Sequence, residues 1–326
     1  MSKDKRVYVT RKLPKKALEM LEREFKVEVN PHDRVMTREE LETAVKDIDG
    51  LLCLLTDSID SELLELNPDL KVIANYAVGY NNIDVEACTK KEIKVSNTPG
   101  VLTDTTADFA WTLLMAAARR IIEADKFTRA GKYKGWGPMM FLGGDIYGKK
   151  LGIIGIGRIG RAFARRAKGF DMDFYYYDVN RLEKAEEKRL GLEYKNFEDL
   201  LKESDFISLH VPLIPQTRHL IGEEELKLMK ETAYLINTAR GPIIDEKALV
   251  WALKNGEIAG AGLDVYEEEP NLYSDLDKLD NTVLTPHIAS ASIETRTKMA
   301  TMAAENLIAG LKGKEMPNLI NKEAVS

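Results

Sequence analysis

The sequence is poor in cysteine and has no long apolar run, and each absence excludes a class of protein. Cys53 and Cys88 are the only cysteines among 326 residues, so neither a disulfide framework nor a cysteine metal site is supported, and we expect no bound metal. Cys53 lies in the apolar run GLLCLL, which predicts a buried, reduced thiol. No apolar run approaches the roughly 18 residues of a membrane span, and the N-terminal MSKDKRVYVTRKL lacks the apolar core of a signal peptide. We therefore expect a cytoplasmic protein without membrane contact.

The chain also lacks an excess of basic residues. Its 47 Lys and Arg against 53 Asp and Glu give a formal net charge of -6, which gives no reason to expect a nucleic acid or an acidic lipid as partner. Neither a tandem repeat nor a low-complexity segment is apparent. The length instead suits two domains, each with its own hydrophobic core.

Short apolar runs alternate with helical patterns along most of the chain. The runs RVYVT, GLLCLL and KVIANYAVG in residues 6–79 are each followed by a helical pattern, which is typical of a parallel sheet covered on both faces. The rhythm stops for a long helical pattern at residues 104–131 and a Gly/Pro-rich loop at 131–150, and it restarts at KLGIIG. Because crossovers are right-handed, the sequence predicts an α/β protein with two doubly wound parallel-sheet domains.

A glycine motif opens the second of these units. Gly155, Gly157 and Gly160 have the spacing G-x-G-x-x-G, between the strand KLGII and a helix that begins with Arg158 and Ile159. In a dinucleotide-binding turn the first glycine permits the turn, the second lets the backbone approach the pyrophosphate, and the third allows close packing of helix and strand. The helix N-terminus adds free N–H groups for the phosphates. We therefore expect a Rossmann-like, dinucleotide-binding domain.

The next strand, DFYYYD, ends in Asp178, which follows Gly160 by 18 residues. An acid about 20 residues beyond the glycines binds the ribose hydroxyls of NAD. A carboxylate there repels a 2′-phosphate, so NAD is favoured, although Asp178 also fits a helix cap. Arg181 nearby leaves NADP open.

Polar side chains follow three later strands of the same unit. Arg240 comes after YLINTA, Glu269 lies in LDVYEEEP, and His287 ends VLTPH. Taken singly, each also fits a structural role, as a surface cation, a solvated acid and a turn histidine. In an open α/β sheet, however, such strand ends line the ligand crevice, so we expect the three to lie near the dinucleotide.

Long motifs along nearly the whole chain resemble the D-isomer-specific 2-hydroxyacid dehydrogenases. The matching segments are GIIGIGRIGRAFARRAKGF, INTARGPIIDEKAL, AGAGLDVYEEEP and TPHIASAS, with NYAVGYNNIDVEACTKKEIKVSNTPG and TADFAWTLLMAAAR upstream. The likeness is closest to the glyoxylate/hydroxypyruvate reductase branch. It implies reduction of a small 2-oxo acid to the D-2-hydroxy acid with NADH or NADPH.

The resemblance assigns catalytic roles to the same three residues. His287 would donate the proton to the substrate carbonyl, and Arg240 would bind the substrate. Glu269 would orient the imidazole of His287 and favour its charged form. This chemistry is reasonable by itself, since a guanidinium fork matches a carboxylate and a carbonyl, and a histidine is the usual proton donor near neutral pH.

The resemblance also implies binding positions. The backbone N–H groups of Val78 and Gly79 would bind the substrate carboxylate, with Leu55 and Ser290 nearby, although Leu55 fits simple core packing equally well. In addition to the glycine motif, Arg158, Ile159 and Asp178, the positions implied to bind the cofactor are Thr106, Pro212, Thr217, Thr238, Ala239, Asp264 and Ala289.

The resemblance further implies a domain layout and an oligomer. Residues 1–99 with 290–326 would form the substrate-binding domain, residues 100–289 the NAD(P)-binding domain, and the active site would be the cleft between them. Residues 100–148 would include the dimerisation arm of a homodimer, in which Trp136, Met139, Met140 and Phe141 are exposed and Trp136 is a candidate to reach the partner's substrate pocket.

Several alternatives stay open. The short tail, ending NLINKEAVS, disfavours D-3-phosphoglycerate dehydrogenase, formate dehydrogenase carries glutamine in place of Glu269, and D-lactate dehydrogenase differs in the segment that here reads IASASIETR. Phosphite dehydrogenase keeps a similar trio. A non-catalytic, NAD-sensing binding module is the rival from another class, although a sensor needs no proton donor beside the nicotinamide.

Overall fold

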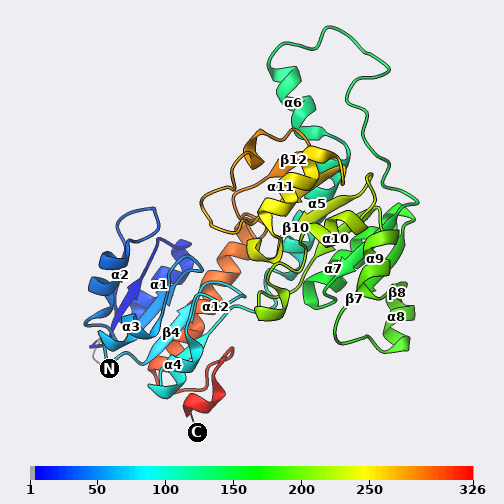
Figure 1. Ribbon diagram of the computed structural model, residues 1–326. Coiled ribbons are helices and arrows are strands. Elements are labelled where there is room, and N and C mark those ends of the chain that lie inside the picture. Colours follow the sequence, from blue (N-terminus) through cyan, green and yellow to red (C-terminus); the bar gives the residue numbers. More distant parts are fainter. Residues whose placement is uncertain (1–3, 326) are drawn as a thin grey trace. The chain divides into compact units, whose positions relative to one another are not determined.

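The computed structural model describes residues 4–325 and contains two compact units. One consists of Met1–Leu102 and Ala291–Ser326, and the other of Thr103–Ser290. Residues 1–3 and 326, which the predicted substrate-binding domain includes, lie outside the described residues. Each unit contains its own parallel sheet with helices on both faces (Figure 1), so the predicted fold class is confirmed.

The first unit is built on a five-stranded sheet of order β2-β1-β3-β4-β5, in which every pairing is parallel. This is a doubly wound order, whose ligands bind at the carboxyl ends of the strands. The strands are β1 (Arg6–Val9), β2 (Lys26–Val29), β3 (Gly50–Cys53), β4 (Val72–Asn75) and β5 (Lys94–Ser96).

Helices cover both faces of this sheet because successive strand residues point to opposite sides. Leu52 packs with the helices of one face and Leu51 with those of the other. Figure 1 shows α12, the last long helix, running beside β4. The first face carries α1 (Lys15–Glu24) and α12 (Ile293–Leu311), and the second α2 (Arg38–Val45), α3 (Ser61–Glu65) and α4 (Val85–Lys90).

The second unit contains a seven-stranded parallel sheet of order β12-β11-β10-β9-β6-β7-β8. Its first strand, β6, lies between β7 and β9, so the order of the strands reverses at the β6/β9 boundary. Such a reversal is where dinucleotides bind in this architecture. The strands are β6 (Lys150–Ile154), β7 (Asp173–Tyr177), β8 (Leu192–Tyr194), β9 (Phe206–Leu209), β10 (Tyr234–Asn237), β11 (Gly260–Leu263) and β12 (Thr282–Leu284).

Two apolar clusters fill the second unit, one on each face of its sheet. Trp111 packs on Phe163 in the first cluster, with ring centroids 5.4 Å apart. Helices α5 (Thr103–Ala118), α7 (Arg158–Ala167) and α8 (Lys184–Leu190) cover that face, and α9 (Phe197–Glu203), α10 (Glu223–Leu228) and α11 (Glu246–Asn255) cover the other.

The long helical pattern at residues 104–131 is not one helix. The structure divides it into α5 and α6 (Ile121–Arg129), with Arg120 in the left-handed region at φ +52° between them. The N–H group of Gly144 donates to the carbonyl of Ala118 (3.0 Å), so the returning loop caps the end of α5. The helical pattern of the sequence continues past Arg120 and does not reveal where α5 ends. The contact that ends α5 comes from Gly144, 26 positions after Ala118.

Helix α6 and the loop after it extend away from the sheet of the second unit (Figure 1). Trp136 is 84% exposed and Met139 77%, and Met140 is also exposed. The prediction that Phe141 is exposed is wrong, because its ring packs edge-on against Phe127 at 5.2 Å.

Both cysteine thiols are buried and free, as the sequence predicts. Burial, with the neighbouring Asp57 adding to its effect, raises the pKa of the Cys53 thiol well above its usual range. Within residues 4–325, no helix is long and apolar enough to cross a bilayer.

Candidate active site

The glycine motif lies where the strand order of the second unit reverses. Gly155 follows β6 and has φ +91°, a backbone conformation that favours glycine. A Cβ atom at Gly155 would also lie 2.7 Å from the carbonyl group of His210, which follows β9. Both the conformation and the close approach of two chain segments therefore require glycine at this position.

The other two glycines differ in what surrounds them. A Cβ atom at Gly160 would lie 2.1 Å from the carbonyl oxygen of Gly155, so this glycine allows helix α7 to pack against the turn. A Cβ atom at Gly157 would meet nothing within 4 Å. Gly157 is the N-cap of α7 and offers no side-chain cap. The turn thus combines open space with the uncapped N–H groups of a ten-residue helix, which fits a pyrophosphate.

Asp178 lies at the end of β7, beside this turn. Its Oδ2 atom accepts from the N–H group of Ile156 (2.8 Å), and its Oδ1 atom accepts from that of Asn180 (2.9 Å). Arg181 instead pairs with Glu187, at 2.8 Å between Nε and Oε1. The acidic group therefore contacts the glycine turn, whereas the nearby cation is held by another carboxylate.

A buried hydroxyl at the end of β10 adds to the fit with a dinucleotide. The Oγ1 atom of Thr238 is buried, and among the described residues it has no hydrogen-bond partner. Leaving such a group unpaired costs about 1–3 kcal/mol, so a bound ligand that pairs with it gains that free energy. The side chain of Thr106, on α5, is also buried.

His287 and Glu269 contact each other directly. The Nδ1 atom of His287 lies 2.9 Å from Oε2 of Glu269, and the side chains are 25% and 29% exposed. The other carboxylate oxygen, Oε1, accepts from the N–H group of Tyr266 (3.1 Å). Glu269 is thus anchored at one oxygen and orients the imidazole with the other, which makes Nε2 the ring nitrogen available for proton transfer.

The loop that carries His287 is held by Asp264, which follows β11. The two oxygens of Asp264 accept from the N–H groups of Ile288 (2.8 Å) and Ala289 (2.7 Å), and one also accepts from the hydroxyl of Thr285 (2.7 Å). Burial raises the pKa of Asp264, and these donors oppose that rise. His287 itself lies in the left-handed region at φ +54°, a conformation that this loop must sustain.

Arg240 is placed by a tight turn after β10. The side chain of Asn237 donates to the carbonyl of Arg240 (2.9 Å), and Nη1 of Arg240 donates to the carbonyl of Ala239 (2.7 Å). A Cβ atom at Gly241 would lie 1.9 Å from the carbonyl group of Tyr266. This close approach joins the loop of Arg240 to the loop of Glu269, so glycine after the arginine is a packing requirement.

Electrostatics couple the three side chains. Burial lowers the pKa of Arg240, and the nearby Glu269 opposes this shift. Burial raises the pKa of Glu269, but the hydrogen bond and charge of His287, the N–H group of Tyr266 and the charge of Arg240 outweigh it and leave a net lowering. The lowered pKa keeps Glu269 ionised beside the imidazole of His287 and the guanidinium of Arg240.

Two further histidines of the second unit were not among the site residues predicted from the sequence. His219 is at φ +50° and contacts Glu267, with 2.6 Å between Nε2 and Oε1. His210 retains some exposed surface, but its ring packs on Phe163 and its Nε2 atom is 3.0 Å from the hydroxyl of Ser208. Desolvation of the ring lowers the pKa of His210 to about 3, so the imidazole is neutral at neutral pH. Its ring and backbone pack beside the glycine turn. The segment LHVPL, a histidine at a strand end, was the available signal.

Other predicted positions fall in both units. Leu55, Val78 and Gly79 lie in loops at the carboxyl ends of β3 and β4 of the first unit, whereas Ser290 is the last residue of the second. The hydroxyl of Thr217 accepts from the N–H group of Ile214 and donates to the carbonyl of Pro212 (2.6 Å), so it holds the loop after β9.

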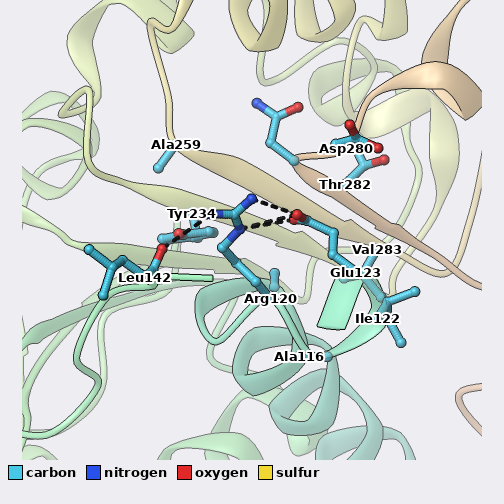
Figure 2. A pocket seen from close by; sticks show the side chains of 12 residues that line it. Ala116, Arg120, Ile122, Glu123, Leu142, Tyr234, Ala259, Asp280, Thr282 and Val283 are labelled. Atoms are coloured by element: carbon cyan, nitrogen blue, oxygen red, sulfur yellow. Dashed lines mark hydrogen bonds and ion pairs between the residues drawn. The ribbon is translucent and has the colours of Figure 1, made fainter. Parts of the chain in front are cut away.

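A cavity of about 290 Å³ lies at the opposite, amino-terminal edge of the sheet in the second unit (Figure 2). Arg120 and Glu123 meet there at 2.6 Å, and the guanidinium also reaches the carbonyl of Leu142. The charges of Arg120 and Glu123 neutralise each other. Because the cavity lies at the amino-terminal edge of the sheet, it is distinct from the carboxyl strand ends that carry Arg240, Glu269 and His287.

Comparison with known proteins identifies a family and similar proteins. Residues 111–289 match the model of the NAD binding domain of D-isomer specific 2-hydroxyacid dehydrogenases. A glyoxylate reductase of Korarchaeum cryptofilum is 57% identical over 322 residues, which cover 98% of this chain and 97% of that protein.

Two solved structures are also similar. A protein of Thermus thermophilus has 45% identity and a TM-score of 0.90, with 97% of this chain and 99% of that chain covered. An NADPH-dependent glyoxylate/hydroxypyruvate reductase of Sinorhizobium meliloti, solved with NADP and malonate, has 32% identity and a TM-score of 0.86, with 99% and 98% covered.

Proposed function

Because the chain belongs to the D-isomer specific 2-hydroxyacid dehydrogenase family, an oxidoreductase family with an NAD-binding domain, we propose that it reduces glyoxylate or hydroxypyruvate to the corresponding 2-hydroxy acid. The contact between His287 and Glu269 carries this proposal. It supplies an oriented, charge-stabilised proton donor, which the reduction of a carbonyl needs and a cofactor sensor does not.

A nicotinamide cofactor held at the glycine turn after β6 would supply the hydride for the carbonyl carbon. The protonated His287 gives the proton of Nε2 to the carbonyl oxygen, whose π electrons form the new O–H bond. Glu269 holds the imidazole through Nδ1 and stabilises its charge before the transfer. Arg240 binds the substrate with charge-assisted hydrogen bonds, each worth roughly 1.5–3 kcal/mol. Oxidation of the 2-hydroxy acid runs through the same groups in reverse.

The cofactor would be held by the turn after β6 and by the later strand ends. The carboxylate of Asp178 beside the turn favours NADH, since it repels a 2′-phosphate, and Arg181 is already paired with Glu187. The proposed cofactor-binding residues are Thr106, Gly155, Gly157, Arg158, Ile159, Gly160, Asp178, Pro212, Thr217, Thr238, Ala239, Asp264 and Ala289.

The proposed substrate-binding residues are the backbone N–H groups of Val78 and Gly79, which would bind the carboxylate, together with Leu55 and Ser290. The proposed substrate-binding domain is residues 1–99 with 290–326, and the proposed NAD(P)-binding domain is residues 100–289. The protein acts as a cytoplasmic homodimer. Exposed apolar side chains on the arm, Trp136 and Met139 above all, support this assembly, because such a patch is unfavourable in water.

The test is a substrate panel followed by NADH absorbance. Glyoxylate, hydroxypyruvate, pyruvate and phosphohydroxypyruvate are each offered with NADH and with NADPH, and phosphite is offered with NAD⁺. Highest kcat/KM with glyoxylate or hydroxypyruvate supports the proposal. Preference for phosphohydroxypyruvate or phosphite would assign the chain to another activity of the family, and no turnover with any of them would support the sensing module.

A further inference from the structure

The loop after β4, Tyr76–Asn82, has three successive carbonyl groups that are each bound by a neighbouring residue. The carbonyl of Ala77 accepts from the N–H group of Thr98 (2.9 Å). That of Val78 accepts from Nδ2 of Asn97 (2.7 Å), and that of Gly79 accepts from Nδ2 of Asn75 (3.0 Å). All of these residues belong to the first unit.

This arrangement fixes the direction of three N–H groups. In a trans peptide the carbonyl and the N–H group point in opposite directions. Binding the carbonyls of Ala77, Val78 and Gly79 therefore turns the N–H groups of Val78, Gly79 and Tyr80 the other way. Within residues 4–325 none of these N–H groups donates a hydrogen bond. Successive backbone N–H groups of a turn that have no partner within the protein can together bind an anion.

The same set of hydrogen bonds, which we call the clamp, also joins this loop to the neighbouring loop after β3. Asn75 is fully buried, and its Nδ2 atom lies 3.3 Å from the side-chain oxygen of Asn82. The amide of Asn82 in turn donates to the carbonyls of Leu54 (3.1 Å) and Asp57 (3.0 Å). The carboxylate of Asp57 accepts from the N–H group of Leu54 (2.7 Å). The two loops at the carboxyl ends of β3 and β4 are thus tied into one rigid piece.

We infer that Asn97 and Asn75 are positioning residues that, together with the N–H group of Thr98, orient three backbone N–H groups toward the substrate carboxylate and so set the affinity for 2-oxo acids. This inference rests on the proposed function, which places that carboxylate at Val78 and Gly79. Neither asparagine touches the substrate. Each acts through a carbonyl of the loop, and a preorganised donor set gains affinity because it costs no reordering on binding.

The experiment replaces Asn97 by Asp, which keeps the size but removes the donor. The matched control is Asn67→Asp, because Asn67 binds the carbonyls of Val45 (2.7 Å) and Ile48 (2.8 Å) of the same unit. These residues precede β3 and β4, at the opposite end of the strands from the substrate loops. We expect Asn97→Asp to raise the KM for glyoxylate about 2- to 12-fold, which corresponds to the roughly 0.5–1.5 kcal/mol of one hydrogen bond, while the KM for NADH changes less than twofold. Asn67→Asp alters thermal stability and leaves both KM values unchanged.

A second measurement separates this inference from the proposed function. Oxalate, a carboxylate that is not reduced, is titrated calorimetrically into the wild type and into Asn97→Asp and Asn97→Ala. Weaker oxalate binding to both variants supports the clamp even if glyoxylate is not turned over. Unchanged oxalate affinity and unchanged KM for glyoxylate in folded Asn97→Asp, or an equal loss in Asn67→Asp, would overturn it.

Discussion

The Nδ1 atom of His287 lies 2.9 Å from Oε2 of Glu269, although the two residues come from loops after different strands. Glu269 is fixed in turn by the N–H group of Tyr266, and the loop of His287 is fixed by Asp264. This pairing gives the second unit an oriented imidazole beside the end of β10, where Arg240 is placed.

Glu269→Gln tests the electrostatic part of this pairing. A neutral amide keeps the shape but removes the charge whose coupling to His287 holds the pKa of Glu269 below its ordinary value, so we expect the pH above which reduction slows to fall. The pH dependence of kcat/KM for glyoxylate measures this shift. Glu268→Gln, a change at the exposed neighbour, is the control and should leave the profile in place. An identical profile for Glu269→Gln would contradict the role of its charge.

Gly241→Ala tests the close approach between the loops of Arg240 and Glu269. The added methyl group would meet the carbonyl of Tyr266 at 1.9 Å and force the backbones apart. Such overpacking costs about 1–3 kcal/mol of unfolding free energy, and a 1 Å displacement of a catalytic group lowers the rate about 10²-fold. Thermal unfolding and kcat measure the two effects. Gly169→Ala, where a Cβ atom meets nothing within 4 Å, should leave both intact.

Asp178→Asn tests the preference for NADH. Asparagine retains an acceptor for the N–H group of Ile156 and removes the charge that repels a 2′-phosphate. We expect the ratio of kcat/KM with NADPH to kcat/KM with NADH to rise about 10-fold, or ~1.4 kcal/mol. Asp173→Asn, at the other end of β7, should not change the ratio. A ratio that Asp178→Asn leaves unaltered would show that the ribose is not near this carboxylate.

His210 predicts part of the acid sensitivity of folding. Its folded-state pKa of about 3 lies below the ordinary value of 6.5, so the unfolded chain binds a proton that the folded chain does not. Its contribution to stability therefore falls as the pH drops from 6.5 toward 3. The urea midpoint at several pH values should depend less on pH in His210→Asn than in the wild type, and His32→Asn, at an exposed histidine, should follow the wild type. Parallel curves for His210→Asn and the wild type would contradict a neutral imidazole at His210 in the folded protein.

The exposed apolar side chains on the arm within residues 100–148 predict a homodimer. Replacing Trp136 and Met139 by Ser should convert the proposed dimer to a monomer in sedimentation, because burial of each such side chain is worth about 1.5–3 kcal/mol. Val35→Ser, at an exposed apolar residue of the first unit, is the control. A wild type that sediments as a monomer would refute the homodimer directly.

The parts of the molecule that were predictable from the sequence are those in which residues close in the chain act together. The three glycines of the turn lie within six positions, and the strand ends that carry Arg240, Glu269 and His287 follow apolar runs that are visible in the sequence. Parallel sheets expose these ends at one edge, so the fold and the position of these side chains at the strand ends could be predicted together.

What the sequence did not disclose depends on contacts between distant residues. Helix α5 ends where a loop 26 residues further along binds Ala118, and Phe141 is covered by Phe127 from α6. Asn97 reaches the carbonyl of Val78, 19 positions before it, and in the sequence it resembles any turn asparagine. Side-chain partners of this kind are set by packing, which local periodicity does not encode.

The proton-donor role of His287 is tested most directly by the kinetics of His287→Asn with glyoxylate and NADH, compared with the wild type. Positioned acid catalysis contributes about 10²–10⁴-fold, so kcat should fall by that factor while the dissociation constant of NADH, measured by fluorescence, changes less than twofold. A His287→Asn protein that binds NADH normally and keeps kcat within threefold of the wild type would contradict the assignment.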